Sequence, residues 1–102
     1  LKSILYNLII NAVKYRSPER PCQVQVRTYI QNQRIVLEVE DNGLGIEAYQ
    51  KDKVFKLFKR LHDHVEGSGI GLYIIKRLIE DKGGSIELNS APGKGSCFIV
   101  VF

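Results

Sequence analysis

The chain opens with hydrophobic positions at helical spacing. Over the first thirteen residues they recur every three or four positions, as in a helix that buries one face. These positions are Leu1, Ile4, Leu5, Leu8, Ile9, Ala12 and Val13. Two prolines, Pro18 and Pro21, predict that the helix ends before Ser17.

An alternating pattern follows and predicts a β-hairpin. Residues 22–30 alternate as in a half-buried strand. The side expected to face the core carries Val24, Val26, Thr28 and Ile30. Residues 31–33 (Gln-Asn-Gln) predict a turn, and the next strand is expected to point Ile35, Leu37 and Val39 inward and Val36 outward.

The C-terminal third predicts a second helix and a second hairpin. The buried stripe of this helix is expected to contain Ile70, Ile74, Ile75, Leu78 and Ile79. Gly83-Gly84 is expected to close it with a left-handed cap. Strands near 85–90 and 96–102 flank a turn at 91–95, and residues 47–66 form a charged, helix-rich insertion. This order predicts an α+β two-layer sandwich: one mixed, mostly antiparallel sheet with helices on one face.

Composition narrows the class of protein. The 102 residues allow one domain, and 44% hydrophobic with 25% charged residues is ordinary for a globular chain. No apolar run approaches the roughly 20 residues of a membrane span. The chain starts inside a helical pattern without a methionine, so we expect a piece of a longer protein.

Charge and cysteine content add two expectations. Fifteen basic against eleven acidic residues give a net charge of +4, too mild and dispersed to favour a nucleic-acid partner. Cys22 and Cys97 lie far apart with no ligand-spaced residue near either. We expect two reduced, packed thiols in a cytosolic protein, and no metal site built on cysteine.

Three polar residues of the first helix share one stripe. Asn7, Asn11 and Lys14 are spaced by four and three, and asparagine is a poor helix former. One interpretation is a pair of buried asparagines satisfied by backbone groups. The other is a strip that offers amide oxygens to a cation and donors to phosphates.

Asp41 continues the inward phase of its strand. A carboxylate on the core face is costly unless it finds donors. It could form a turn in the sequence Asp-Asn-Gly, or it could accept a hydrogen bond from a ligand amino group. In the second case Gly43 and Gly45 would let the backbone approach a flat ring.

A glycine triplet opens the second helix. Gly67, Gly69 and Gly71 stand where free amides and the helix dipole favour an anion, although a flexible hinge has the same pattern. The triplet is neither a Walker loop nor a dinucleotide fingerprint, because no Gly-Lys-Ser/Thr follows and no strand precedes. The insertion before it is either a solvated helix or a cationic lid over phosphates; its basic residues are Lys51, Lys53, Lys56, Lys59 and Arg60. Phe55 and Phe58 would then anchor the lid, or they are simply core residues.

In this order the motifs resemble the catalytic, ATP-binding domain of bacterial two-component sensor histidine kinases, within the Bergerat-fold superfamily of gyrase, Hsp90 and MutL. Two motifs of that family are called the N box and the F box. The pattern Asn7-x-x-x-Asn11-Ala12-x-Lys14-Tyr15 resembles the N box, and Phe55-x-x-Phe58-x-Arg60 resembles the F box. Residues 41–46 (DNGLGI) and 67–72 (GSGIGL) resemble the two glycine boxes of the family, and residues 93–96 (GKGS) resemble its final turn. The resemblance covers residues 1–102, and residues 58–72 especially resemble those of phytochrome-type and hybrid sensor kinases.

The resemblance implies ATP and Mg²⁺ as ligands. It implies that Asn11 gives its side-chain oxygen to Mg²⁺, while Asn7 and Lys14 contact phosphate or metal-bound water. Asp41 would accept from the adenine amino group. The rest of the implied nucleotide pocket is Tyr15, Gly43, Gly45, Ile46 and Ser96, the last standing where many relatives have threonine.

The resemblance also implies an ATP lid at about 47–66 and a phosphate cradle after it. Phe55 and Phe58 would set the lid, and Arg60 would reach the γ-phosphate, acting with Asn7 and Lys14 in catalysis. The cradle would be formed by Gly67, Ser68, Gly69, Ile70, Gly71 and Leu72.

The implied activity is phosphoryl transfer to a separate domain. Asn7 stands where ATPase relatives carry a glutamate that activates water, and an amide cannot act as a base. The expected acceptor is a histidine on the dimerisation domain of a cytoplasmic-facing, homodimeric parent kinase, which then phosphorylates a response regulator receiver domain.

The family fold normally starts with a further strand and helix, so we expect a domain incomplete at its N-terminus that binds nucleotide more readily than it catalyses. The alternatives are an anti-sigma-type Ser/Thr kinase, a non-catalytic nucleotide-sensing or docking module, and, third, a nucleic-acid module.

Overall fold

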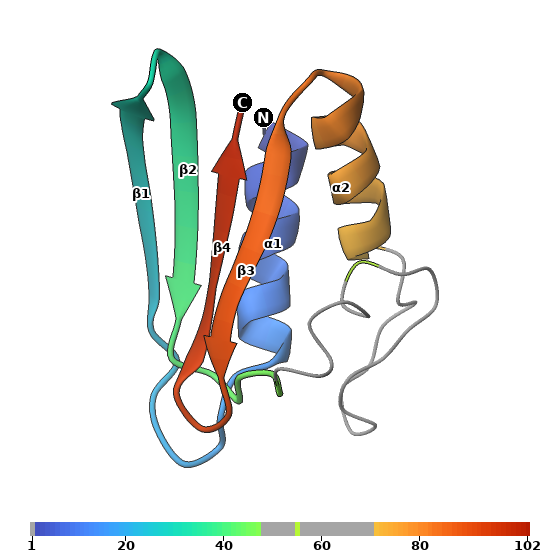
Figure 1. The fold of residues 1–102 in the computed structure, drawn as a ribbon. Helices are drawn as coiled ribbons and strands as arrows, with labels where there is room; N and C mark the ends of the chain where they lie inside the picture. The colour runs from blue at the N-terminus through green and yellow to red at the C-terminus, as the bar shows by residue number, and fades with distance from the viewer. Residues whose placement is uncertain (1, 48–54, 56–70) are drawn as a thin grey trace.

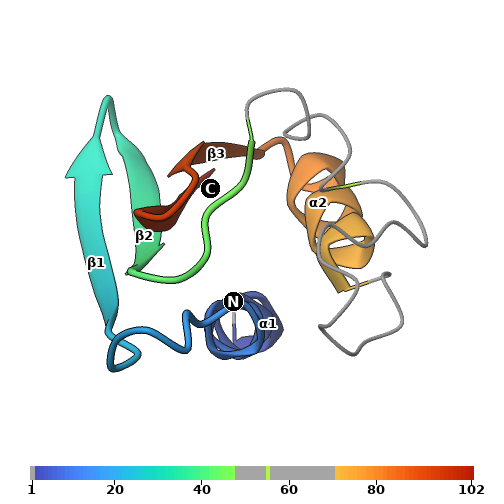
Figure 2. The same cartoon turned by 90° about the horizontal axis from the view of Figure 1, so that it is seen from below.

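The computed structural model describes residues 2–47, 55 and 71–102 and contains two helices and one sheet in this part of the chain (Figure 1). The elements in chain order are α1 (Lys2–Lys14), β1 (Val24–Gln31), β2 (Arg34–Asp41), α2 (Gly71–Asp81), β3 (Ser85–Ala91) and β4 (Gly95–Val101). The strands are ordered β1-β2-β4-β3, and every neighbouring pair is antiparallel. Both helices lie on one face of the sheet, which confirms the α+β two-layer prediction; no parallel pair occurs among these four strands (Figure 2).

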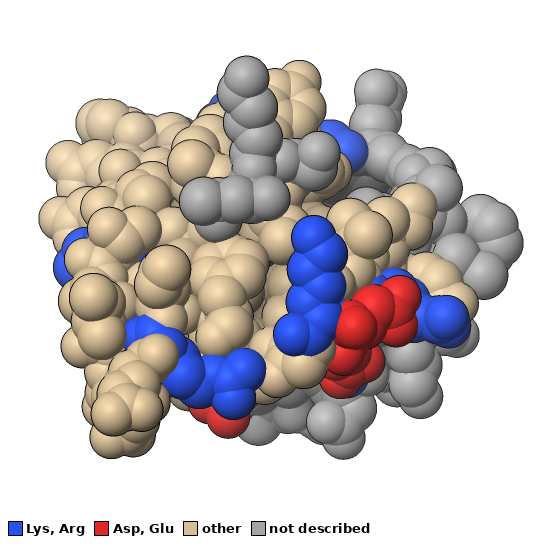
Figure 3. Space-filling view, turned by 90° about the horizontal axis from the view of Figure 1, so that it is seen from above, with Lys and Arg blue, Asp and Glu red and all other residues tan. Residues whose placement is uncertain are grey.

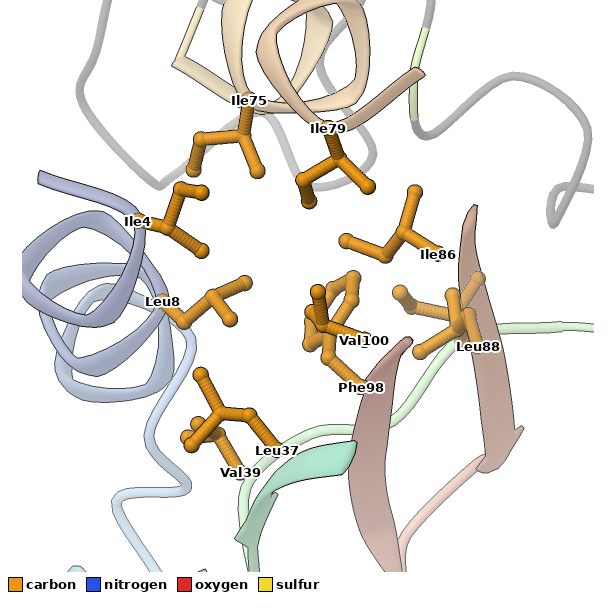
Figure 4. Close-up of a cluster of buried hydrophobic side chains, with 11 residues drawn as sticks. Ile4, Leu8, Leu37, Val39, Ile75, Ile79, Ile86, Leu88, Phe98 and Val100 are labelled. Carbon is orange, nitrogen blue, oxygen red and sulfur yellow. The ribbon is translucent and has the colours of Figure 1, made fainter. Parts of the chain in front are cut away.

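The core lies between the two helices and the inner face of β2, β4 and β3 (Figure 4). α1 contributes Ile4 and Leu8, and α2 contributes Ile75 and Ile79, all nearly inaccessible to solvent. The sheet contributes Leu37, Val39, Ile86, Leu88, Phe98 and Val100. Each such side chain stabilises the fold by about 1.5–3 kcal/mol relative to an exposed position, so the core holds the helices in place on the sheet.

Two turns form as the sequence predicts. Asn32 and Gln33 have positive φ of 52° and 66°, as in a two-residue hairpin turn, and pair Gln31 with Arg34. α2 ends at a left-handed Gly83 with φ of 83°, and the amide of Gly84 donates to the carbonyl oxygen of Ile79 at 3.0 Å.

The buried stripes of the helices are narrower than predicted. Val13 is 40% exposed, Ile74 is 47% exposed and Leu78 is 44% exposed, although all three were expected to be buried. Each helix packs on a single layer, so a stripe one or two residues wide is enough to cover its contact with the sheet and with the other helix. Leu1 and Ile70 lie outside the described residues.

The prediction that β1 is half-buried is wrong. Val26 is 43% exposed and Ile30 is 77% exposed, and their neighbour Ile35 at the start of β2 is 55% exposed. β1 is the edge strand, and Figure 2 shows it lying beyond the helical layer. Val24 at the start of β1 is partly buried against the core, but the later inward-facing side chains have no helix over them.

Val36 was expected to face solvent but is only 2% exposed. It lies on the outer face of the sheet, in one row with Tyr29 of β1 and Val101 of β4, which flank it. Next to this row, Arg27 forms ion pairs with Glu38 at 3.0 Å and with Glu40 at 2.6 Å. The outer face thus has its own small packed cluster, which alternation alone does not reveal.

The two cysteines differ from each other. Both are free, as expected, but Cys22 is exposed rather than packed. Cys97 is half-buried, and this burial raises the pKa of its thiol.

Within the described part of the chain, neither helix has the length and apolar character that a membrane crossing requires. At the end of the molecule seen in Figure 3, the described Lys and Arg side chains lie apart from one another, and some of them lie beside Asp or Glu side chains.

Candidate functional site

Three chain segments meet where α1 and β2 end and β4 begins (Figure 1). The amide of Leu44, in the loop after β2, donates to the carbonyl oxygen of Tyr15 at 2.8 Å. The amide of Gly93, in the turn between β3 and β4, donates to the carbonyl oxygen of Leu44 at 2.8 Å. The fold therefore brings together the end of the α1 strip, the loop that begins at Asp41 and the turn that leads to Ser96.

Asp41 is buried at this meeting point, with 8% exposure. Its Oδ1 accepts from the amide of Gly43 at 2.9 Å and from the amide of Ser96 at 3.3 Å. Among the described residues all hydrogen bonds of this carboxylate end on Oδ1, which leaves Oδ2 able to accept from a ligand. Burial raises the pKa of Asp41, and the two amides only partly offset that rise. The turn-forming and ligand-accepting interpretations are therefore compatible, because they use different oxygens.

The glycines of the loop are required by neighbouring backbone. A Cβ at Gly43 would lie 2.4 Å from the carbonyl oxygen of Tyr15. Gly45 has φ of +76°, and a Cβ there would lie 2.0 Å from the carbonyl oxygen of Ala91. These contacts explain both glycines without a ligand, in addition to the approach of a flat ring that the sequence suggested.

Ser90 joins the site although the sequence did not point to it. Its Oγ accepts from the amide of Ile46 at 2.8 Å, donates to the carbonyl oxygen of Gly95 at 2.9 Å and lies 2.8 Å from Oγ of Ser96. A hydroxyl has one proton, so the arrangement that satisfies all three contacts has Ser96 donating to Ser90. Lone pairs of the buried Ser96 hydroxyl are then available to a ligand beside Asp41.

The polar strip of α1 leads away from this point. Asn7 and Asn11 are half-buried and Lys14 is exposed. With the helical rise, Asn11 lies about 6 Å and Asn7 about 12 Å along the axis from Tyr15, whose carbonyl is bonded to the Asp41 loop. The amide side chain of Asn11 makes no hydrogen bond to any residue the structure describes, so its oxygen is available for a cation.

Of the residues expected to form the lid and the phosphate cradle, the structure describes Phe55, Gly71 and Leu72. The ring of Phe55 packs edge-on against Phe98 with centroids 6.1 Å apart, and Nζ of Lys76 lies 5.3 Å from the Phe55 centroid. Gly71 is the first residue of α2, and Leu72 packs against the core. The other expected lid and phosphate residues lie outside the described residues: Phe58, Arg60, Gly67, Ser68, Gly69 and Ile70.

Arg20 is the second residue that sequence reasoning missed. Its Nε donates to the carbonyl oxygen of Asn42 at 2.6 Å, and its Nη2 donates to those of Gly43 at 2.7 Å and Gly93 at 2.8 Å. The only signal in the sequence was an arginine between two prolines, which we read as a chain break.

Asn42 ties the same loop to the segment after α1. Its Oδ1 accepts from the amide of Gln23 at 2.9 Å, and its Nδ2 donates to the carbonyl oxygen of Pro21 at 2.9 Å. Its position directly after Asp41 in a turn sequence was the available signal.

Comparison with known proteins places this arrangement in a family. Residues 1–102 match the family described as histidine kinase-, DNA gyrase B- and HSP90-like ATPase. The chain belongs to this ATPase family. It is 36% identical to the sensor protein RprX of Bacteroides fragilis over 98% of the chain, and 40% identical to the aerobic respiration control sensor protein ArcB of Escherichia coli over 96% of the chain. The ATPase domain spans 20% of the length of RprX and 13% of that of ArcB, so it corresponds to a small part of each sensor.

Solved structures agree with this assignment. The mycobacterial sensor histidine kinase MprB superposes with a TM-score of 0.85 at 28% identity, covering 98% of this chain and 69% of that one. Full-length ShkA in complex with AMPPNP superposes with a TM-score of 0.83 at 27% identity, covering 97% of this chain and 20% of that one. The chain is therefore an ATPase domain of the sensor histidine kinase type, in a family that binds ATP, generally with Mg²⁺.

Proposed function

We propose that this ATPase domain binds Mg·ATP and that Asp41 recognises the adenine amino group. The observation that carries the proposal is the asymmetric carboxylate of the buried Asp41 side chain: two backbone amides bond Oδ1, and no described residue bonds Oδ2. An acceptor held in place by its own backbone selects a ligand that offers an N–H group.

The α1 strip is suited to the phosphate end of the nucleotide. Asn11 offers an amide oxygen, a hard ligand of the kind Mg²⁺ accepts, and Lys14 offers an exposed ammonium group. Bound Mg²⁺ would neutralise phosphate charge. We assign Asn7 and Lys14 to positioning the phosphates, and Tyr15 to the wall of the pocket beside the Asp41 loop.

We further propose that the domain supplies the γ-phosphoryl group to a histidine on a separate domain. Neither asparagine of the strip can remove a proton from water, so the described site holds the donor without a base of its own for hydrolysis. A neutral imidazole needs no such base, and catalysis then consists mainly of positioning and charge neutralisation. We propose residues 47–66 as the lid, Arg60 as the contact to the γ-phosphate, and residues 67–72 as the phosphate cradle. A dimeric parent kinase would pass the phosphoryl group on to a response regulator receiver domain.

Calorimetric titration tests the nucleotide assignment. We expect saturable binding of Mg·ATP, weaker binding of ATP with EDTA, and weaker binding of Mg·GTP, which carries an oxygen where adenine carries the amino group. Absence of binding, or equal affinity for ATP and GTP, would refute the role of Asp41.

Transfer is tested with the histidine-bearing domain of the full-length protein and radiolabelled ATP. A phosphoprotein that is labile in acid and stable in alkali supports histidine as the acceptor. An acid-stable product would instead support the Ser/Thr kinase alternative.

A further inference from the structure

Arg20 joins three backbone carbonyl groups from two segments that are distant in sequence. The acceptors are the carbonyls of Asn42 and Gly43, directly after Asp41, and that of Gly93, in the turn before Ser96. The distances of 2.6, 2.7 and 2.8 Å are those of charge-assisted hydrogen bonds. No ion pair of Arg20 occurs within the part of the chain that the structure describes. The guanidinium is therefore used as a rigid donor to the backbone.

The contact fits arginine specifically. Its planar group carries five N–H donors in a fixed fork, so one side chain can bond three carbonyls that converge on it. A lysine ammonium group has three donors on a flexible stem and cannot match that planar arrangement.

Movement of this loop would displace the proposed base-recognition group. The amide of Gly43, whose carbonyl bonds Arg20, also donates to Oδ1 of Asp41 and thereby directs Oδ2. The loop has little other freedom, because Gly43 and Gly45 are in close contact with the backbone of Tyr15 and Ala91. Arg20 adds three hydrogen bonds that join the segment after α1 to this loop and to the β3–β4 turn.

We propose that Arg20 is a positioning residue that holds the Asp41–Gly45 loop in the conformation that selects a 6-aminopurine. This inference rests on the proposed nucleotide site. None of the hydrogen bonds of Arg20 reaches Asn7, Asn11 or Lys14, so its effect falls on the base and leaves the triphosphate end unchanged.

The test compares three ligands by calorimetry: Mg·ATP, Mg·GTP and Mg·tripolyphosphate. For Arg20→Ala we expect a dissociation constant for Mg·ATP about tenfold higher, and an ATP-over-GTP preference reduced by a similar factor, because a loosened acceptor discriminates poorly. Tripolyphosphate affinity is expected to stay within about twofold. Arg20→Lys should fall between wild type and Arg20→Ala, and it replaces Arg20→Ala if the alanine variant does not fold.

Arg34→Ala is the matched control. Arg34 bonds carbonyls in the same way, with Nε to Phe102 at 2.8 Å and Nη2 to Gly83 at 2.7 Å, but it does so at the opposite end of the sheet. It should lower the melting temperature without changing the ATP-over-GTP preference.

The outcomes separate the two proposals. Wild-type protein that binds no ATP would overturn the proposed function and this inference together. Wild-type binding with an unchanged base preference in Arg20→Ala would overturn only the role of Arg20. An equal loss of ATP and tripolyphosphate binding would also overturn it, because that pattern indicates general structural damage.

Discussion

Replacing Asp41 with asparagine exchanges one oxygen for an NH₂ group and keeps the size of the side chain. The amides of Gly43 and Ser96 require an acceptor at the position of Oδ1, so the amide oxygen of the new residue stays there. The NH₂ group then occupies the position of Oδ2, and its N–H donors face the adenine amino group, which is itself a donor. The substitution converts an attraction into a donor–donor contact.

The size of the effect follows from the hydrogen bond that is lost. A hydrogen bond to a charged group contributes about 1.5–3 kcal/mol, so the dissociation constant for Mg·ATP should rise by roughly 10- to 160-fold. The folded state should not suffer, because burial raises the pKa of Asp41 and the neutral amide avoids the cost of burying the charge. A 6-oxopurine accepts from the new NH₂ group, so the preference for ATP over ITP should fall or reverse.

Calorimetry with both nucleotides measures the affinities, and thermal unfolding checks the fold. Glu40→Gln is the matched control, because Glu40 is the neighbouring acid on β2 but is exposed on the outer face and paired with Arg27. The reasoning is refuted if Asp41→Asn binds Mg·ATP within about twofold of wild type, or if Glu40→Gln loses affinity to the same extent.

The remaining predictions concern the cation, the loop and pH. Asn11→Ala should lower the affinity for Mg·ATP to near that for ATP in EDTA while leaving the melting temperature little changed; an undiminished effect of Mg²⁺ would contradict the metal assignment. Gly45→Ala should destabilise the fold by about 1–3 kcal/mol in urea unfolding, because φ is +76° and the new Cβ would meet the carbonyl oxygen of Ala91 at 2.0 Å; a neutral substitution would show that the loop can move. The raised pKa of Asp41 means that the folded state binds the proton more tightly than the unfolded state, so wild type should gain stability relative to Asp41→Asn as pH falls from neutral through the raised value toward the ordinary 3.8. A stability difference that is constant with pH, or of opposite sign, would exclude a desolvated carboxylate.

Local patterns identified the elements because they depend on neighbours in the chain. The first helix, both hairpins and the glycine cap of α2 follow from periodicity and turn chemistry, and each forms where it was expected. Five ordered motifs also identified the family. The inward phase of Asp41 was read correctly, since β2 alternates without interruption from Leu37 to the buried carboxylate.

Other features depended on how the layers are assembled. Ile30 is exposed and Val36 is buried because β1 is an edge strand and because Tyr29 and Val101 flank Val36 on the outer face, and neither fact is encoded within a single strand. The hydrogen bonds of Arg20 to Asn42 and Gly93 join residues separated by 22 and 73 positions. The sequence alone shows which chemical groups are available for this site. Only the packing of the helices against the sheet brings these groups within hydrogen-bonding distance, because hydrogen bonds act only over a few ångströms.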